Sequence, residues 1–139
     1  MKRKASAVWR GGLKDGKGTI STDSGVLKDT QYSFATRFES GVGTNPEELI
    51  AAAHAGCFAM AFSAELGKAS LTPDSISATA TVTLDKTNEG FTVTESHLDV
   101  TAKVPGADRA KVTEIANAAK AGCPISRLLK ANVTMDLNL

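Results

Sequence analysis

The residues with the clearest chemical potential are two cysteines in nearly the same setting. Cys57 lies in the segment AGCF (55–58), inside a long apolar run, and Cys123 lies in AGCP (121–124). Each follows a glycine, which leaves room for another group to approach. Two thiols that meet in space can cycle between dithiol and disulfide. Redox chemistry is therefore the first hypothesis, and the alternative is a pair of ordinary buried cysteines that only fill space.

The two settings predict different thiol reactivities. In apolar surroundings alone the pKa of Cys57 would rise, so this thiol needs a cation from elsewhere in order to react. Cys123 precedes Pro124 at a predicted helix start, where unpaired backbone N–H groups and the helix dipole favour a thiolate. The alternative for Cys123 is a plain first residue of a turn.

Arg37 and Glu47 are the charged candidates for this site, and each has two interpretations. Arg37 lies among aromatic residues of a predicted strand. It is either an exposed edge-strand arginine or a guanidinium that holds a thiolate and polarises a bound oxygen. Glu47 is either a first-turn acid favoured by the helix dipole or the carboxylate that fixes Arg37. Both interpretations of Glu47 can hold together.

The two histidines provide weaker signals. His54 precedes Cys57 by one helical turn and could act as the base of a cysteine hydrolase, but no orienting carboxylate is apparent. A buried, hydrogen-bonded histidine is the favoured interpretation, and we expect His97 to be exposed on a strand. The histidines and cysteines do not form a recognised zinc spacing. We therefore expect no metal and no other cofactor.

Composition limits the possible partners. The chain has 139 residues and a formal net charge of +1, with no basic stripe, so we expect neither nucleic-acid nor membrane-surface binding. Two cysteines are too few for a disulfide scaffold, and the N-terminus lacks an apolar stretch of signal-peptide length. We expect a single domain over residues 1–139 in the cytoplasm, where a thiol pair remains reducible.

Hydrophobic periodicity and turn residues predict alternating strands and helices. We expect strands over 4–10, 19–22, 31–38, 76–84, 91–104 and 131–139, helices over 46–66 and 108–120, and a short helical turn from 124. Asn45 and Glu48 should form a capping box, with Gly67 as the stop. A change of phase near Glu95 and Ser96 predicts a β-bulge. The core positions expected on the second helix are Val112, Ile115, Ala116 and Ala119.

The first helix is apolar on nearly all sides. Between Leu49 and Ala64 only His54 and Ser63 interrupt the apolar residues, a run too short for a typical membrane span. A buried helix fits better, but one small domain can hardly cover every face of it. We therefore expect a partner subunit to help cover this helix.

Two motifs together carry a family resemblance. The segments GTNPEELIAAAHAGCF (43–58) and KAGCPIS (120–126) resemble the superfamily of osmotically inducible protein C (OsmC) and organic hydroperoxide resistance (Ohr) proteins. The segments KGTIST (17–22), TRFE (36–39) and LDK (84–86) resemble the OsmC branch. The resemblance implies an α+β fold: an intertwined homodimer in which a long buried central helix packs against an antiparallel β-sheet.

The resemblance also implies a function and four site residues. The chain would be a thiol-dependent peroxidase that reduces organic hydroperoxides to alcohols, with a dithiol reductant such as a lipoyl-bearing protein. Cys57 would attack the peroxide and form a sulfenic acid, and Cys123 would resolve it as a Cys57–Cys123 disulfide. Arg37 matches the OsmC-branch arginine and Glu47 the active-site carboxylate. Phe34, Phe38, Phe58 and Met60 are candidate contacts for an organic substituent.

Two alternatives remain open at this point. The first is a non-enzymatic dimeric protein that binds hydrophobic ligands and whose cysteines are structural. The second concerns geometry: Glu47 and Cys57 are ten residues apart, or ~15 Å along one straight helix. We therefore expect Glu47 of one subunit to approach Cys57 of the other, with a broken helix or a long-range contact within one subunit as the alternative.

Overall fold

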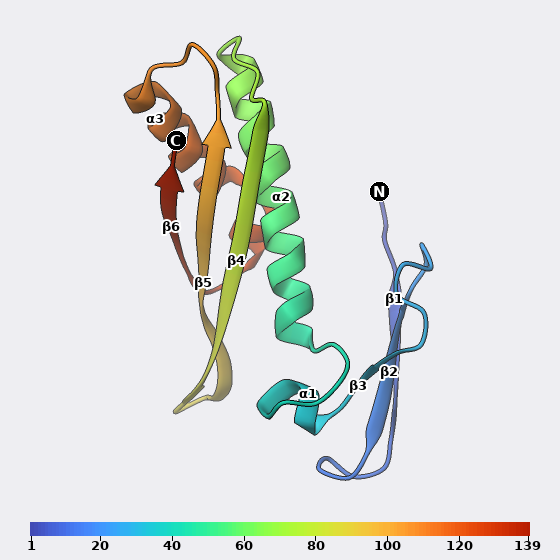
Figure 1. The fold of residues 1–139 in the computed structure, drawn as a ribbon. Coiled ribbons are helices and arrows are strands. Elements are labelled where there is room, and N and C mark those ends of the chain that lie inside the picture. Colours follow the sequence, from blue (N-terminus) through green and yellow to red (C-terminus); the bar gives the residue numbers. More distant parts are fainter. The chain divides into compact units, whose positions relative to one another are not determined.

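The computed structural model describes residues 1–139, which form two compact units, 1–49 and 50–139 (Figure 1). The first unit holds three strands in the order β1-β2-β3 and a short helix. Their bounds are β1 Ala5–Arg10, β2 Lys17–Thr22, β3 Thr30–Tyr32 and α1 Phe34–Phe38. Both strand pairs are antiparallel. The long helix α2, Pro46–Lys68, begins in this unit and continues into the second.

The predicted strand over 31–38 is wrong in its second half, which forms α1. Ser33 starts this helix with a capping box: its Oγ accepts from the Thr36 N–H, and the Thr36 Oγ1 accepts from the Ser33 N–H. The alternation of aromatic and small residues suits a strand, but two hydroxyls three residues apart satisfy the first turn of a helix instead. Arg37 therefore lies on a helix and not on a strand.

The N-cap of α2 is Asn45 as predicted, but Glu48 does not play the predicted part in a capping box. The Asn45 Oδ1 accepts from the Glu48 N–H at 2.7 Å, which caps the helix ahead of Pro46. The Glu48 carboxylate does not complete a capping box, because it accepts from Thr44 Oγ1 at 2.8 Å. At the other end Gly67 is not the stop. The left-handed residue that ends the helix is Ser70, with φ 58°.

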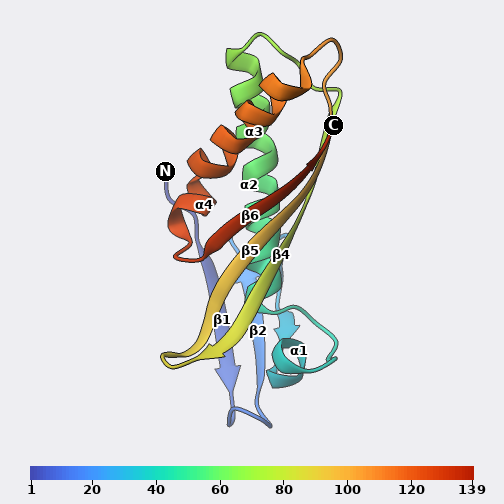
Figure 2. The same ribbon diagram turned by 90° about the vertical axis from the view of Figure 1, so that its left-hand side faces the viewer.

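The second unit contains a mixed sheet in the order β4-β5-β6. Its elements after α2 are β4 Ser75–Thr87, β5 Gly90–Lys103, α3 Arg109–Gly122, α4 Pro124–Leu128 and β6 Asn132–Asn138. β4 and β5 are antiparallel, but β6 pairs with β5 in parallel, so the expected antiparallel sheet is correct only for the hairpin. The parallel pairing follows from the connection, because α3 and α4 carry the chain back before β6 begins (Figure 2).

The predicted β-bulge is present. Thr83 pairs with Glu95, whereas the next residue of β4, Leu84, pairs with Val93, which leaves Thr94 as the extra residue. The bulge reverses the face on which the apolar side chains of β5 lie. From Ser96 onward alternate residues of β5 face the core.

The core of the second unit lies between the sheet and two helices. It is formed by Phe58, Phe62 and Leu66 of α2, Leu98, Val100 and Ala102 of β5, Val112, Ile115, Ala116 and Ala119 of α3, and Cys123 at the end of α3. All four core positions predicted on the second helix are therefore confirmed. Their spacing of three and four residues places them on one helical face.

Only one face of α2 is covered within the chain. Its apolar window has a mean hydropathy of 1.5, and the helix is long and apolar enough to cross a membrane by composition alone, yet 22% of that window is buried. The buried face carries His54 and the phenylalanines, as expected for a core helix. The opposite side leaves Met60 78% exposed. The expectation of burial on nearly all sides is therefore not met within one chain.

Candidate active site

The structure brings the two cysteines together. Cys123 is fully buried and its thiol donates to the Sγ of the half-buried Cys57 across 2.9 Å. Both cysteines are in the free thiol form. A disulfide has an S–S length of about 2.05 Å, so a movement of roughly 1 Å would join these sulfur atoms. The two cysteines are 66 positions apart in the sequence, and both lie in the second unit, whose fold brings them together.

Local sequence explains how each thiol reaches this position. Cys57 precedes Phe58 on α2, and the Phe58 ring is wholly buried in the core, which fixes the rotation of the helix about its axis. Cys123 ends α3 and begins α4, with φ −53° and ψ 126°. The ring of Pro124 disfavours a helical conformation at Cys123 and suits the first position of α4. The chain therefore turns sharply at the thiol.

The electrostatics of the pair favour the neutral thiol in this chain. Burial raises the pKa of Cys57, and the adjacent Cys123 raises it further. The backbone N–H of Ile125, in the first turn of α4, acts in the opposite direction by donating to the sulfur. Burial is the larger effect, as the apolar setting predicts. An additional positive charge is needed to make Cys57 a thiolate near neutral pH.

The structure also brings Arg37 and Glu47 together, within the first unit. The Nε and Nη2 of Arg37 donate to the Oε1 of Glu47 at 2.9 and 2.7 Å. Both bonds use one side of the guanidinium and leave Nη1 for another acceptor. Asn45 connects the two elements, because its side chain donates to the Thr36 carbonyl at 3.0 Å while capping α2. Glu47 thus fixes Arg37, as one of its two interpretations predicts.

Glu47 has an unusual second oxygen. Its side chain is only 12% exposed, and Oε2 is buried without a hydrogen-bond partner in the chain. An unsatisfied buried carboxylate oxygen is costly, at ~1–3 kcal/mol or more. The Arg37 side chain, 39% exposed, is the more accessible member of the pair.

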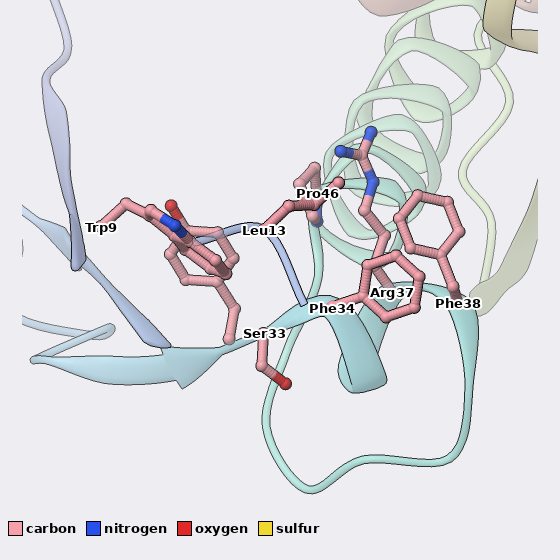
Figure 3. A pocket seen from close by; sticks show the side chains of 8 residues that line it. Trp9, Leu13, Ser33, Phe34, Arg37, Phe38 and Pro46 are labelled. Carbon is pink, nitrogen blue, oxygen red and sulfur yellow. The ribbon is translucent and has the colours of Figure 1, made fainter. Parts of the chain in front are cut away.

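A pocket of about 260 Å³ opens beside Arg37 in the first unit. Its lining is mostly apolar and comprises Trp9, Leu13, Tyr32, Ser33, Phe34, Arg37, Phe38 and Pro46. Figure 3 shows the guanidinium close to Phe38 and Pro46, Leu13 between Pro46 and Trp9, and the Ser33 hydroxyl turned away. Such a cavity suits an apolar group joined to a polar or anionic head.

Of the four residues expected to contact the organic part of a substrate, two lie in the pocket and two lie elsewhere. Phe34 and Phe38 line the pocket as expected. Phe58 cannot contact a ligand, because its ring is completely buried in the core of the second unit. Met60 lies on the exposed face of α2. Trp9 and Leu13 are pocket residues that the sequence did not single out, because they come from the strand and turn before the motifs.

His54 is buried and hydrogen-bonded on both ring nitrogens. Nδ1 lies 2.7 Å from Ser96 Oγ, and Nε2 lies 2.8 Å from Ser126 Oγ. Burial lowers the pKa of His54, so the ring is neutral near pH 7. No carboxylate contacts it, which agrees with the preferred interpretation over the hydrolase base. Neither serine was singled out in the sequence, although Ser126 lies within the second cysteine motif.

His97 differs from expectation, because it is half-buried on the outer face of the sheet. Its Nδ1 contacts Thr134 at 2.5 Å, and its Nε2 lies 3.5 Å from Asp99 and 3.3 Å from Asp136. The three potential ligand atoms lie within 4.8 Å of one another, a spacing that could hold a divalent cation. Direct contact between the imidazole and the two aspartates, without a metal, accounts for the same geometry. The thiol pair does not involve this group.

Comparison with known proteins identifies the family. The family model described as OsmC-like protein matches residues 39–138, most of the chain. The chain belongs to the OsmC family. Among curated OsmC relatives, Peroxiredoxin OsmC of Escherichia coli (strain K12) is 53% identical over 137 residues, covering 99% of this chain and 96% of that protein.

Two further comparisons extend to the Ohr proteins. The organic hydroperoxide resistance protein OhrB of Bacillus subtilis (strain 168) is 32% identical, covering 97% of this chain and 96% of that protein. The crystal structure of Bacillus subtilis OhrB superposes with a TM-score of 0.73 at 33% identity, covering 98% and 97% of the two chains. The resemblance to OsmC and Ohr proteins is thereby confirmed, as is the α+β fold.

Proposed function

We propose that this OsmC-family protein is a thiol peroxidase that reduces organic hydroperoxides to alcohols through Cys57 and Cys123. The observation that carries the proposal is the 2.9 Å separation of the two free thiols. Two relatives support it by name, one as a peroxiredoxin and one as an organic hydroperoxide resistance protein. We also propose a cytoplasmic location, where dithiol reductants keep the pair reduced.

The reaction begins at the more accessible sulfur. The Cys57 thiolate attacks the terminal peroxide oxygen, the O–O bond breaks, and the alkoxide leaves as an alcohol after taking up a proton. Cys57 is now a sulfenic acid. The Cys123 thiol attacks this sulfur, releases water and forms the disulfide, which protects Cys57 from further oxidation. A dithiol, such as a lipoyl group, then supplies two electrons and two protons to restore both thiols.

Arg37 is the proposed source of the positive charge that Cys57 lacks. A guanidinium near the sulfur lowers the pKa of the thiol and stabilises charge on the peroxide oxygens during O–O cleavage. Glu47 keeps Arg37 in place through Oε1, and the free Nη1 remains for the substrate or sulfur. The apolar pocket beside Arg37 would hold the organic part of the hydroperoxide.

We propose that the active protein is an intertwined homodimer and that each site uses both subunits. The uncovered apolar side of α2, including Met60, supports a second copy as its cover. Glu47 and Cys57 are ~15 Å apart along a straight helix, so the partner's α2 is the better source of Glu47 for a given Cys57. The two units would then be parts of one domain, residues 1–139.

The same pocket supports a second candidate function. A mostly apolar cavity of about 260 Å³ could bind a hydrophobic ligand without any chemistry at the cysteines. In that case replacing Cys57 would leave ligand uptake unchanged and the protein would not consume hydroperoxide.

Hydroperoxide consumption tests the proposal against this alternative. Wild-type protein with excess dithiothreitol should turn over cumene hydroperoxide and oxidise one dithiol per peroxide, whereas Cys57→Ser should not. Cys123→Ser should consume about one equivalent in a burst. Equal turnover by wild type and Cys57→Ser would rule out the catalytic role, and so would absence of consumption by the wild type.

A further inference from the structure

The buried contacts of His54 connect the two segments that carry the cysteines. His54 lies on α2, one turn before Cys57, and contacts Ser126 of α4 at 2.8 Å. Cys123 is the N-cap of the same short helix. On its other side the ring contacts Ser96 of β5 at 2.7 Å. The imidazole therefore links the helix of one thiol, the helix of the other and the sheet.

Besides the Ile125 N–H bond to the Cys57 sulfur, α4 has few other attachments to the rest of the unit. None of its five residues is fully buried, and Ile125 is its one residue packed against the core cluster. A short helix with so little apolar burial is held weakly by packing alone. Cys123 itself is buried in the core cluster where α3 ends, and the His54–Ser126 hydrogen bond adds a polar contact that holds the α4 side of this residue.

We propose that His54 is a positioning residue, and that its hydrogen bond to Ser126 holds α4 so that Cys123 captures the oxidised Cys57. This inference rests on the proposed function for its oxidant, the organic hydroperoxide. The captured form is the sulfenic acid; the Cys123 sulfur bonds to the Cys57 sulfur, and the sulfenic oxygen leaves as water. His54 touches neither sulfur nor substrate in this role.

Loss of the His54–Ser126 hydrogen bond should also shift the dithiol–disulfide equilibrium of Cys57 and Cys123, which can be measured without peroxide. In the dithiol state the hydrogen bond keeps the two thiols at high effective concentration. In the disulfide state the covalent bond already restrains α4. Loss of the hydrogen bond therefore frees α4 mainly in the dithiol state, and the disulfide becomes easier to reduce. With sulfenic Cys57, a freed Cys123 also closes the disulfide more slowly, so a second hydroperoxide more often oxidises Cys57 to sulfinic acid.

The chain offers a matched pair of variants. Ser126→Ala removes the contact to α4, whereas Ser96→Ala removes one hydroxyl from the same histidine without touching α4. Each purified protein is equilibrated with reduced and oxidised dithiothreitol. The fraction of protein that carries the Cys57–Cys123 disulfide is then measured by thiol alkylation and mass spectrometry. Ser126→Ala should lower the disulfide/dithiol equilibrium constant by about two- to tenfold, the range of one hydrogen bond. Ser96→Ala should leave it near the wild-type value.

Further measurements separate positioning from general destabilisation. Thermal melting of both variants reports the loss of folding stability that any buried serine change would cause. Ser126→Thr, which keeps the hydroxyl, should restore the wild-type equilibrium. Under repeated cumene hydroperoxide, Ser126→Ala should accumulate more sulfinic Cys57 than Ser96→Ala. Equal equilibrium constants for Ser126→Ala and Ser96→Ala would overturn the proposal. A shift in Ser126→Ala without any hydroperoxide consumption by the wild type would support the positioning role and reject the proposed activity.

Discussion

Removal of Arg37 should make Cys57 an ordinary unreactive thiol at neutral pH. Within the chain, burial and then the adjacent Cys123 raise the pKa of Cys57 above the ordinary cysteine value of about 9.0. A thiol with a pKa of 9 is about 1% thiolate at pH 7, and each unit of pKa changes that fraction roughly tenfold. Arg37 is the charge proposed to oppose these effects, so Arg37→Ala should lower the thiolate reactivity of Cys57 at pH 7 by about tenfold or more. The difference should shrink as the pH is raised, because a high pH deprotonates the thiol without help from Arg37.

The assay is the rate of iodoacetamide alkylation of Cys57 as a function of pH. It is measured in a Cys123→Ser background, so that a single thiol reports. Arg10→Ala, which removes an exposed arginine from β1, is the matched control and should keep the wild-type midpoint. A midpoint in Arg37→Ala equal to that in Arg10→Ala would refute the reasoning that Arg37 activates Cys57.

Three further predictions concern assembly and pH. Met60→Glu, on the uncovered side of α2, should convert a sedimenting dimer to monomer, whereas Val26→Glu, on an exposed loop, should not; a dimeric Met60→Glu protein would contradict the proposed interface. Mixing inactive Cys57→Ser and Glu47→Ala subunits should restore one working site in each heterodimer, and no recovery in confirmed heterodimers would place both residues in one subunit's site. Burial lowers the pKa of His54 in the folded protein, so the neutral ring contributes stability that is fully present above the unfolded pKa of ~6.5 and falls by up to ~1.4 kcal/mol per pH unit below that pKa. The free energy of unfolding in urea should therefore decrease less between pH 7 and pH 5.5 in His54→Gln than in wild type. An equal decrease in both proteins would exclude His54 as the source of the pH dependence.

Much of the second unit could be predicted from the sequence because its patterns are local and regular. The four apolar positions of α3 recur at helical spacing, and the phase change in β5 could come only from an extra residue. Cys123 and Pro124 mark a helix start by their backbone chemistry. The parallel pairing of β6 was not predicted, because strand direction depends on the path of the whole connection and not on the strand's own pattern.

The first unit was harder to predict because short polar contacts outweigh periodicity there. The residues from Gln31 to Phe38 alternate like a strand, yet the Ser33–Thr36 capping box makes a helix. The partners of His54 were missed for a related reason: Ser96 and Ser126 are 42 and 72 positions away, and a serine gives no signal of its distant partner. The Arg37–Glu47 pair was reached through family resemblance, since charge and spacing alone left both residues with two interpretations.

The most direct test of the central claim is the intact mass of the reduced protein after one equivalent of cumene hydroperoxide. Wild type should lose two hydrogens as the Cys57–Cys123 disulfide forms, Cys123→Ser should gain one oxygen, and Cys57→Ser should keep its mass. A wild-type mass that does not change while the hydroperoxide remains intact would contradict the account, as would oxidation of Cys57→Ser at the same rate as wild type.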